Sequence, residues 1–124
     1  LFLRSPTTTD VDRDILQWLR SFCEVDLEQY AKEFFEIGSA LRSCTPEEVV
    51  REDCKEFTEH GQRFSISQIE EIGFDLFWNR KEELLEALHN LTQELELDFA
   101  ALLITDIVSN GSLLLLSRDS EAWD

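Results

Sequence analysis

The stretch that decides the fold is FAALLITDIVSNGSLLLLS, residues 99–117, in which two apolar runs flank Asn110-Gly111. An Asn-Gly pair between apolar runs is the strongest short signal for a β-hairpin, because both residues adopt positive φ angles at little cost. The sequence therefore predicts a buried hairpin over these residues.

A polar pair interrupts the first of these two runs. Thr105 and Asp106 follow a series of apolar residues, and a carboxylate in a core strand costs several kcal/mol unless hydrogen bonds compensate it or the strand emerges there. Two interpretations stay open. In one, Asp106 accepts hydrogen bonds from turn amides while Thr105 bonds across the sheet; in the other, Asp106 belongs to a site at the end of the strand.

Helices are predicted in the first half of the chain, each opened by a capping residue. Thr9 with Asp12 has capping-box spacing, Asp26 can cap a second helix that Gly38 ends, and Thr45-Pro46 opens a third. The first helix is expected over about residues 10–23, with apolar residues at helical spacing at Val11, Ile15, Trp18, Leu19 and Phe22.

A second hairpin and a long helix complete the predicted fold. Residues 55–59 and 62–70 flank His60-Gly61, and a break in the apolar alternation points to a bulge near Gln68. A helix opening at residues 73–75 carries an apolar stripe that is expected to pack against the sheet: Phe77, Leu84, Leu88, Leu91 and Leu95. With residues 1–4 as a short strand or extended segment, the fold class is α/β: a mixed β-sheet of about five strands flanked by helices, in a single domain.

Charge and cysteine content limit the classes of partner. The 124 residues include 27 acidic and 11 basic side chains, a net charge of −16, which repels nucleic acid and anionic membranes. Apolar runs of membrane-spanning length and a signal peptide are both lacking, so a soluble cytoplasmic protein is expected. The three cysteines are widely spaced and are expected to be core thiols, without a disulfide framework or a zinc site.

Candidate catalytic residues are scarce. His60 lies at a turn and His89 on a helix, and neither has a Ser, Cys or Asp at a spacing typical of a catalytic triad. The adjacent acidic pairs, such as Glu70-Glu71, point in different directions on a helix or strand and are interpreted as solvated surface. The residues alone predict an acidic α/β domain with no catalytic and no metal-binding residue, and they identify no reaction.

Four segments, in order, resemble the C-terminal, DHH-associated domain of the manganese-dependent (family II) inorganic pyrophosphatases. LRSPTTTD at residues 3–10 is similar to the (L/F)-K-S-P-T-x-T linker of that family. The other three are KEF with FSISQIE (55–57 and 64–70), RKEELL (80–85) and LLITDIVSNGS (102–112), which resemble its strand pair, its long helix and its closing hairpin. Together they span about 110 residues.

The resemblance implies a division of labour. In this family an N-terminal DHH domain holds manganese through His and Asp ligands, while the C-terminal domain closes over the substrate. Residues 1–9 would then be the linker from the catalytic domain, and residues 10–124 the substrate-closing domain, incomplete at its C-terminal end. The parent would hydrolyse pyrophosphate or a related phosphoester, and the isolated chain is expected to be inactive.

An alternative is a non-catalytic interaction or regulatory domain of a DHH-type phosphoesterase or exopolyphosphatase. The strongly acidic composition is compatible with such a module, as is the lack of the family's basic S-R-K-K-Q segment. The oligomeric state is left open, including a homo-oligomer.

The resemblance transfers one substrate-binding residue, Arg4. Arg4 occupies the position of the linker lysine that contacts substrate in the family, and an arginine there keeps the charge but can bind phosphate with two parallel hydrogen bonds. Arg118 follows the last apolar run directly and is not expected to replace the basic residues of S-R-K-K-Q.

Overall fold

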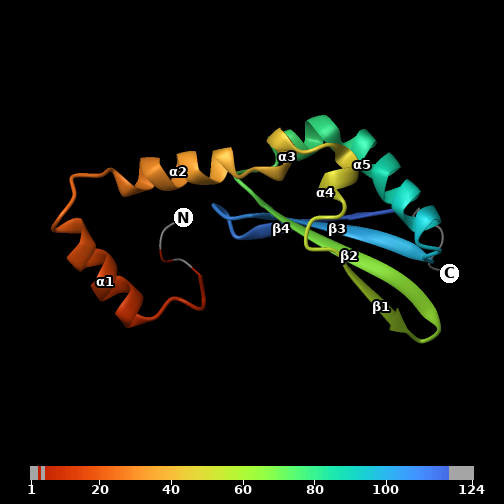
Figure 1. Cartoon of the computed structure of the whole chain (residues 1–124), viewed down its shortest axis with the longest axis horizontal. Helices are drawn as coiled ribbons and strands as arrows, with labels where there is room; N and C mark the ends of the chain where they lie inside the picture. Colours follow the sequence, from red (N-terminus) through yellow and green to blue (C-terminus); the bar gives the residue numbers. More distant parts are fainter. Residues whose placement is uncertain (1–2, 4, 118–124) are drawn as a thin grey trace.

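The computed structural model describes residue 3 and residues 5–117 (Figure 1). Its elements follow one another as α1 (Asp10–Arg20), α2 (Leu27–Ile37), α3 (Ala40–Ser43), α4 (Pro46–Val49), β1 (Lys55–Glu59), β2 (Gln62–Glu71), α5 (Asp75–Glu94), β3 (Phe99–Asp106) and β4 (Gly111–Leu116). The predicted α/β class is confirmed, since helices pack on a mixed sheet.

The sheet has the strand order β1-β2-β3-β4. β1 with β2 and β3 with β4 are antiparallel hairpins, whereas the two central strands, β2 and β3, run parallel and are connected through α5. Within the described residues the sheet has four strands rather than about five. The segment expected as a further strand, residues 1–4, lies mostly outside the described residues, and Leu3 lies in a turn with a φ of 54°.

Both predicted hairpins are present, and their turns differ. His60 and Gly61, with φ angles of 52° and 80°, connect β1 directly to β2. In the second hairpin Asp106 pairs with Gly111, so the connection is the four residues 107–110, and of the Asn-Gly pair only Asn110 has a positive φ, 56°. This turn is wider than the two-residue turn of an Asn-Gly hairpin because Asp106 organises it with its side chain.

The core lies between α5 and one face of the sheet. Leu84, Leu88 and Leu91 of α5 are almost completely buried in a cluster with Leu102 and Ile104 of β3. The expected packing of the helix stripe against the sheet is therefore confirmed, and it shields that face from water.

The bulge expected near Gln68 is absent: β2 pairs with β3 in an unbroken register from Phe64 to Glu71. The apolar alternation changes phase because both faces of β2 carry apolar residues. Ile69 is buried under α5, whereas Ile66 lies on the opposite face beside Ala101 of β3.

Local signals placed three helix starts correctly, whereas α3, which is capped by Ser39, was not expected. Thr9 and Asp12 form a capping box, as do Thr45 and Glu48, and Asp26 accepts hydrogen bonds from the first turn of α2. The first helix ends at Arg20, three residues earlier than expected.

The prediction of core thiols fails for one cysteine. Cys23 is exposed in the segment after α1, whereas Cys44 and Cys54 are half-buried against the core. All three are free thiols. The error for Cys23 follows from the position of α1, which packs no side chain into the core.

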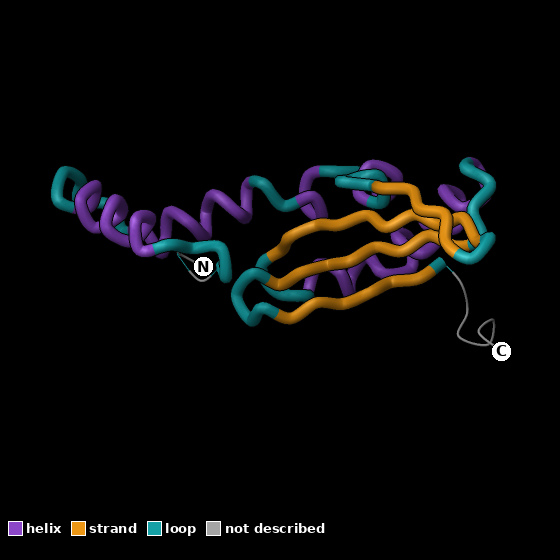
Figure 2. Tube along the Cα trace, turned by 90° about the horizontal axis from the view of Figure 1, so that it is seen from below, coloured by secondary structure: helices purple, strands orange, loops and turns teal. Residues whose placement is uncertain are grey.

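The described chain leaves the apolar side chains of its first helix exposed, and its sheet carries apolar side chains on both faces. α1 and α2 form an arm, residues 10–37, that extends beyond the end of the sheet (Figures 1 and 2); α1 buries none of its side chains and α2 only Ala31. The sheet face opposite α5, here called the open face, bears the apolar side chains Phe57, Phe64, Ile66, Phe99, Ala101, Leu103, Leu114 and Leu116.

Candidate functional site

The carboxyl ends of the parallel strands β2 and β3 meet at one edge of the sheet. Their last residues, Glu71 and Asp106, are register partners and are only 3% and 6% exposed. Ligands of parallel sheets bind in the space beyond the carboxyl ends of the strands. Two buried carboxylates at this edge need hydrogen-bond donors to compensate for the loss of water. Each carboxylate has its own set of donors.

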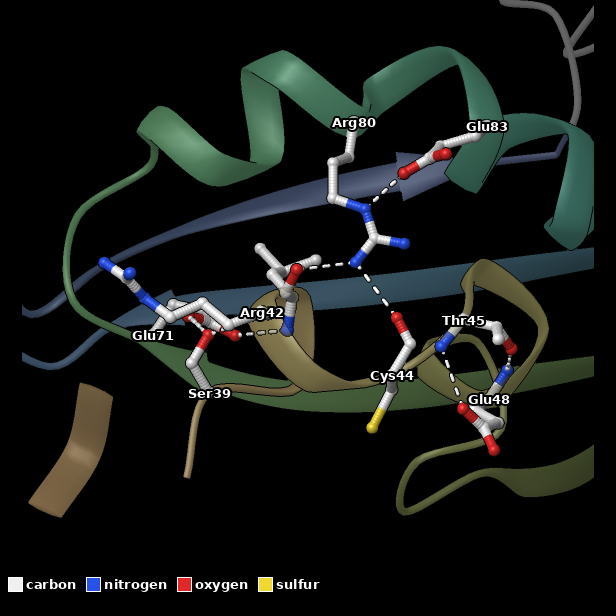
Figure 3. Close-up of polar contacts among 9 residues, drawn as sticks. Ser39, Arg42, Cys44, Thr45, Glu48, Glu71, Arg80 and Glu83 are labelled. Atoms are coloured by element: carbon white, nitrogen blue, oxygen red, sulfur yellow. Dashed lines mark hydrogen bonds and ion pairs between the residues drawn. The ribbon is translucent and has the colours of Figure 1, made fainter. Parts of the chain in front are cut away.

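Glu71 holds the junction between α2 and α3 (Figure 3). One carboxylate oxygen accepts a hydrogen bond from the Ser39 hydroxyl at 2.6 Å, and the other accepts from the Leu41 amide at 3.0 Å. The sequence interpretation of Glu70-Glu71 as solvated surface is correct for Glu70, which is exposed, and wrong for Glu71. β2 is not an apolar run, so the argument that singled out Asp106 does not single out Glu71.

Asp106 holds two loops. Its carboxylate accepts hydrogen bonds from the amides of Gly73 and Val108 at 2.9 Å, and from the amide and hydroxyl of Ser109 at 3.3 and 2.5 Å. The Thr105 hydroxyl bonds across the sheet to Ser112 at 3.0 Å. The first of the two interpretations of this pair is confirmed: turn amides compensate the carboxylate.

The pKa of Asp106 lies below its ordinary value. Burial raises this pKa, but the hydrogen bonds from Ser109, Gly73 and Val108 stabilise the charged form and together outweigh the burial. The carboxylate therefore contributes to stability above the ordinary pKa near 3.8, and this contribution is lost as the pH falls through the lower pKa of the folded state.

We expect Asp106→Asn to lower the free energy of unfolding at neutral pH. We also expect the free energy of unfolding of the variant to fall less steeply than that of the wild type as the pH is lowered. The measurement is urea unfolding of the wild-type and variant chains over a pH series. The difference between them should shrink as the pH falls below about 3.8, the ordinary pKa of the aspartate side chain. A constant difference at every pH would mean that the Asp106 charge has no part in holding the loops.

Arg80 ties the long helix to the same region (Figure 3). Its guanidinium donates to the backbone carbonyls of Leu41 and Cys44, at 2.6 and 3.1 Å, and forms an ion pair with Glu83. These bonds satisfy one carbonyl within α3 and one just after it. With Glu71 and Asp106, Arg80 joins α3, the long helix and both central strands into one frame.

The segment before the arm lies against this frame. Ser5 and Pro6 line a cavity of about 270 Å³ together with Phe35 of α2, Glu70, Thr105, Ile107 and Asn110. The side chains that line it include one carboxylate and, among the described residues, no lysine or arginine. Thr105 and Asn110 supply polar groups that could donate hydrogen bonds to an anion.

Arg4, the residue predicted to bind substrate, lies outside the described residues. Its neighbour Ser5 lines the cavity just described, so the chain reaches the carboxyl edge of β2 and β3 one residue after Arg4. A second arginine was not singled out from the sequence: Arg42 is exposed and borders a smaller cavity with Ser39 and Glu71. Its sequence context, in the four-residue helix α3, carries no binding signal.

The described residues do not form a metal site. In residues 3 and 5–117, no group of three or more His, Cys, Asp or Glu side chains could hold a metal ion. His60 is exposed at the β1–β2 turn, and His89 lies on α5 with Nδ1 3.3 Å from the Ser117 carbonyl oxygen. None of the helices in this part of the chain has the length and apolar character needed to cross a membrane.

Comparison with known proteins identifies the family of this chain, and the relatives that it finds agree with that family. A family model described as the DHHA2 domain matches residues 32–123. The manganese-dependent inorganic pyrophosphatase of Bacillus subtilis is 34% identical over 93% of this chain and 37% of its own length. The cobalt-dependent inorganic pyrophosphatase of Clostridium perfringens is 30% identical over 97% of this chain and 22% of its own length.

A solved structure agrees. The crystal structure of a Methanococcus jannaschii protein described as a family II inorganic pyrophosphatase matches with a TM-score of 0.68 and 30% identity, over 94% of this chain and 39% of that one. The chain thus spans well under half the length of the relatives that it matches. The resemblance seen in the four sequence segments is confirmed.

Proposed function

This chain belongs to the DHHA2 domain family, and we propose that it is the C-terminal, substrate-closing domain of a manganese-dependent inorganic pyrophosphatase. The parent enzyme would convert diphosphate and water into two phosphates. The observation that carries this proposal is the match of nearly the whole chain to proteins named as inorganic pyrophosphatases. We further propose residues 1–9 as the linker and residues 10–124 as the closing domain.

The proposed contribution of this chain is positive charge and orientation at the substrate phosphates. Developing charge on phosphoryl oxygens is stabilised by cations placed before the reaction begins. The cavity wall beside Ser5 carries Glu70 and no described lysine or arginine, so its described side chains lack the required charge. Arg4, one residue away in the chain, is proposed to supply that charge, with Thr105 and Asn110 as neutral donors.

Metal chemistry is proposed for the other domain of the parent. The described residues do not fit a manganese site, and we derive no catalytic step through a metal on this chain. In the parent, manganese would activate the attacking water, with ligands from the N-terminal DHH domain.

The proposed partners are the N-terminal DHH domain and pyrophosphate. A net charge of −16 opposes binding to nucleic acid and to anionic membranes. Three free thiols support a location in the reducing cytoplasm, where disulfides are rare. A homo-oligomer is a further proposal.

The test is a phosphate-release assay on both forms of the protein with manganese present. We expect the intact parent to hydrolyse pyrophosphate and the 124-residue chain to be inactive, because its described residues hold no metal site. Tripolyphosphate and long-chain polyphosphate are assayed beside pyrophosphate as alternative substrates. A parent that cleaves only the longer chains would replace pyrophosphatase by exopolyphosphatase. A parent inactive on all three would favour an interaction module, and turnover by the isolated chain would contradict the placement of the catalytic ligands elsewhere.

A further inference from the structure

The strand β2 is longer than its outer neighbour β1 and continues past it toward the base of α2 (Figure 1). The register of the two strands ends at Lys55 and Ile66, whereas β2 runs on to Glu71. Beyond Ile66, the described chain makes one backbone hydrogen bond on this side of β2, from the Gln68 amide to the Glu52 carbonyl oxygen at 3.1 Å. The last part of this edge is therefore unpaired within the described chain.

The unpaired groups belong to Glu70. Alternate residues of a strand direct their amides and carbonyls to opposite neighbours. The Glu71 carbonyl accepts from the Ile107 amide at 3.1 Å on the β3 side, and the Gln68 amide donates on the other side. Glu70 has the orientation of Gln68, so its amide and carbonyl face away from β3, where the described residues supply no backbone partner. Such an edge is a template for another extended segment.

A cavity of about 290 Å³ lies along this edge. α2 contributes Phe34 and Phe35 to its lining, the turn before β1 contributes Glu52 and Asp53, and β2 contributes residues 68–70. Its volume is at the lower limit of the roughly 300–1,000 Å³ of small-molecule pockets. The space suits a few residues of one extended chain, with backbone bonds to β2 and side chains against α2 and the turn.

The charge of the lining selects a basic segment. Glu52 and Glu70 have no ion-pair partner among the residues that the structure describes, and Asp53 is 3.2 Å from the amino group of Lys55. Carboxylates form their strongest hydrogen bonds with Lys and Arg side chains. The ring of Phe34, 62% exposed, offers an apolar surface for the methylene stem of such a side chain.

We propose that an extended, basic segment of the parent chain, from outside these 124 residues, pairs with the edge of β2 at Gln68 to Glu70 as a further strand. The proposal rests on the proposed function in one respect, namely that this chain is one domain of a longer enzyme. The matched relatives have 63% or more of their length outside the part that this chain covers, since it spans 37% and 22% of them. A segment of the same chain binds at a high effective concentration, so a short contact suffices.

A second copy of this chain is the poorer occupant, because of charge and shape. Two copies that each carry a net charge of −16 repel one another. Of the two outer strands, β4 (Gly111–Leu116) has no charged residue, and the one cation of β1, Lys55, is already paired with Asp53. Each outer strand is also held in a sheet, whereas the cavity has room for a single chain.

The test is photo-crosslinking in the intact parent with benzoylphenylalanine in place of Gln68, which is exposed and lines the cavity. Mass spectrometry identifies the attached peptide. We expect a crosslink within one chain, to a peptide outside residues 1–124 that has a Lys or Arg beside the point of attachment. The matched control carries the same group in place of Thr58, an exposed position of β1 away from the cavity, and should not attach that peptide.

Hydrogen exchange in the intact parent tests the role of charge. Glu52→Lys should speed exchange of the Glu70 amide at least about fivefold, because it repels the basic segment from the edge. Glu47→Lys is the matched control, since Glu47 is an exposed acid of α4 that does not line the cavity, and should change the rate by less than about twofold. Equal effects of the two substitutions would overturn the proposal.

The crosslink also separates the alternative occupants. Attachment only to a second copy, to another protein or to residues 1–124, or no attachment at all, would overturn the proposal. The crosslink does not require catalysis. A parent that forms it without hydrolysing pyrophosphate would support the strand pairing and contradict only the proposed activity.

Discussion

Glu71→Ala is expected to lower the free energy of unfolding of this chain by about 3 kcal/mol, because a hydrogen bond to a charged group contributes roughly 1.5–3 kcal/mol. The substitution removes the acceptor of the Ser39 hydroxyl and of the Leu41 amide, and leaves both buried donors unpaired. The measurement is the shift in the urea unfolding curve at neutral pH. Hydrogen exchange should also be faster at Leu41, since its amide loses its partner.

The matched control is Glu70→Ala, one residue earlier in the same strand. Glu70 is exposed, so its loss should change stability by no more than about 0.5 kcal/mol, as for most surface substitutions. Equal effects of the two substitutions would contradict the structural role given to Glu71. Glu71→Gln should lie between them, because the amide keeps one acceptor oxygen but loses the charge.

Arg4→Ala in the intact parent enzyme is expected to lower kcat/KM for pyrophosphate by about 30- to 1,000-fold, or about 2–4 kcal/mol of transition-state stabilisation. Removing one charge-stabilising donor from an active site typically has this effect. Arg4→Lys should keep most of the activity, because the charge remains although the bidentate geometry is lost. Steady-state phosphate release gives both values.

Stability should change by no more than about 0.5 kcal/mol in either Arg4 variant, since the neighbouring Ser5 and Pro6 are exposed. Arg63→Ala is the control for charge alone. Arg63 pairs with the exposed Glu56 at the far end of β2, away from the proposed substrate edge, and its loss should leave kcat/KM unchanged. If Arg4→Ala kept full activity with normal melting, Arg4 would be a linker residue only.

Helix starts and hairpins are the parts of this protein that sequence reasoning located well. A capping box joins residues three positions apart, as Thr9 and Asp12 show, and its geometry is complete within one turn. His60-Gly61 likewise makes its turn with neighbouring residues alone. The family resemblance rests on similar short segments, which is why it could be recognised before the fold was known.

The candidate site was only half predictable. Asp106 could be singled out because it interrupts an apolar run. Hydrogen bonds from turn amides to its buried carboxylate were one of the two interpretations of this residue, and they are present. Its register partner Glu71 escaped notice because adjacent acids on a strand point to opposite faces, and the sequence does not say which face is covered. The donors to Glu71 come from residues about thirty positions away, at Ser39 and Leu41.

What the sequence determined by itself is therefore local: where helices begin, where strands turn back, and which family the segments resemble. The tertiary structure alone decided the parallel pairing of β2 with β3, which brings Glu71 beside Asp106, and the placement of Ser5 against their carboxyl edge. It also decided that the apolar side chains of α1, Trp18 among them, are exposed. The physical reason is the distance along the chain over which each interaction acts. The hydrogen bonds of caps and turns form between residues a few positions apart, whereas the burial of a side chain depends on which distant element covers it.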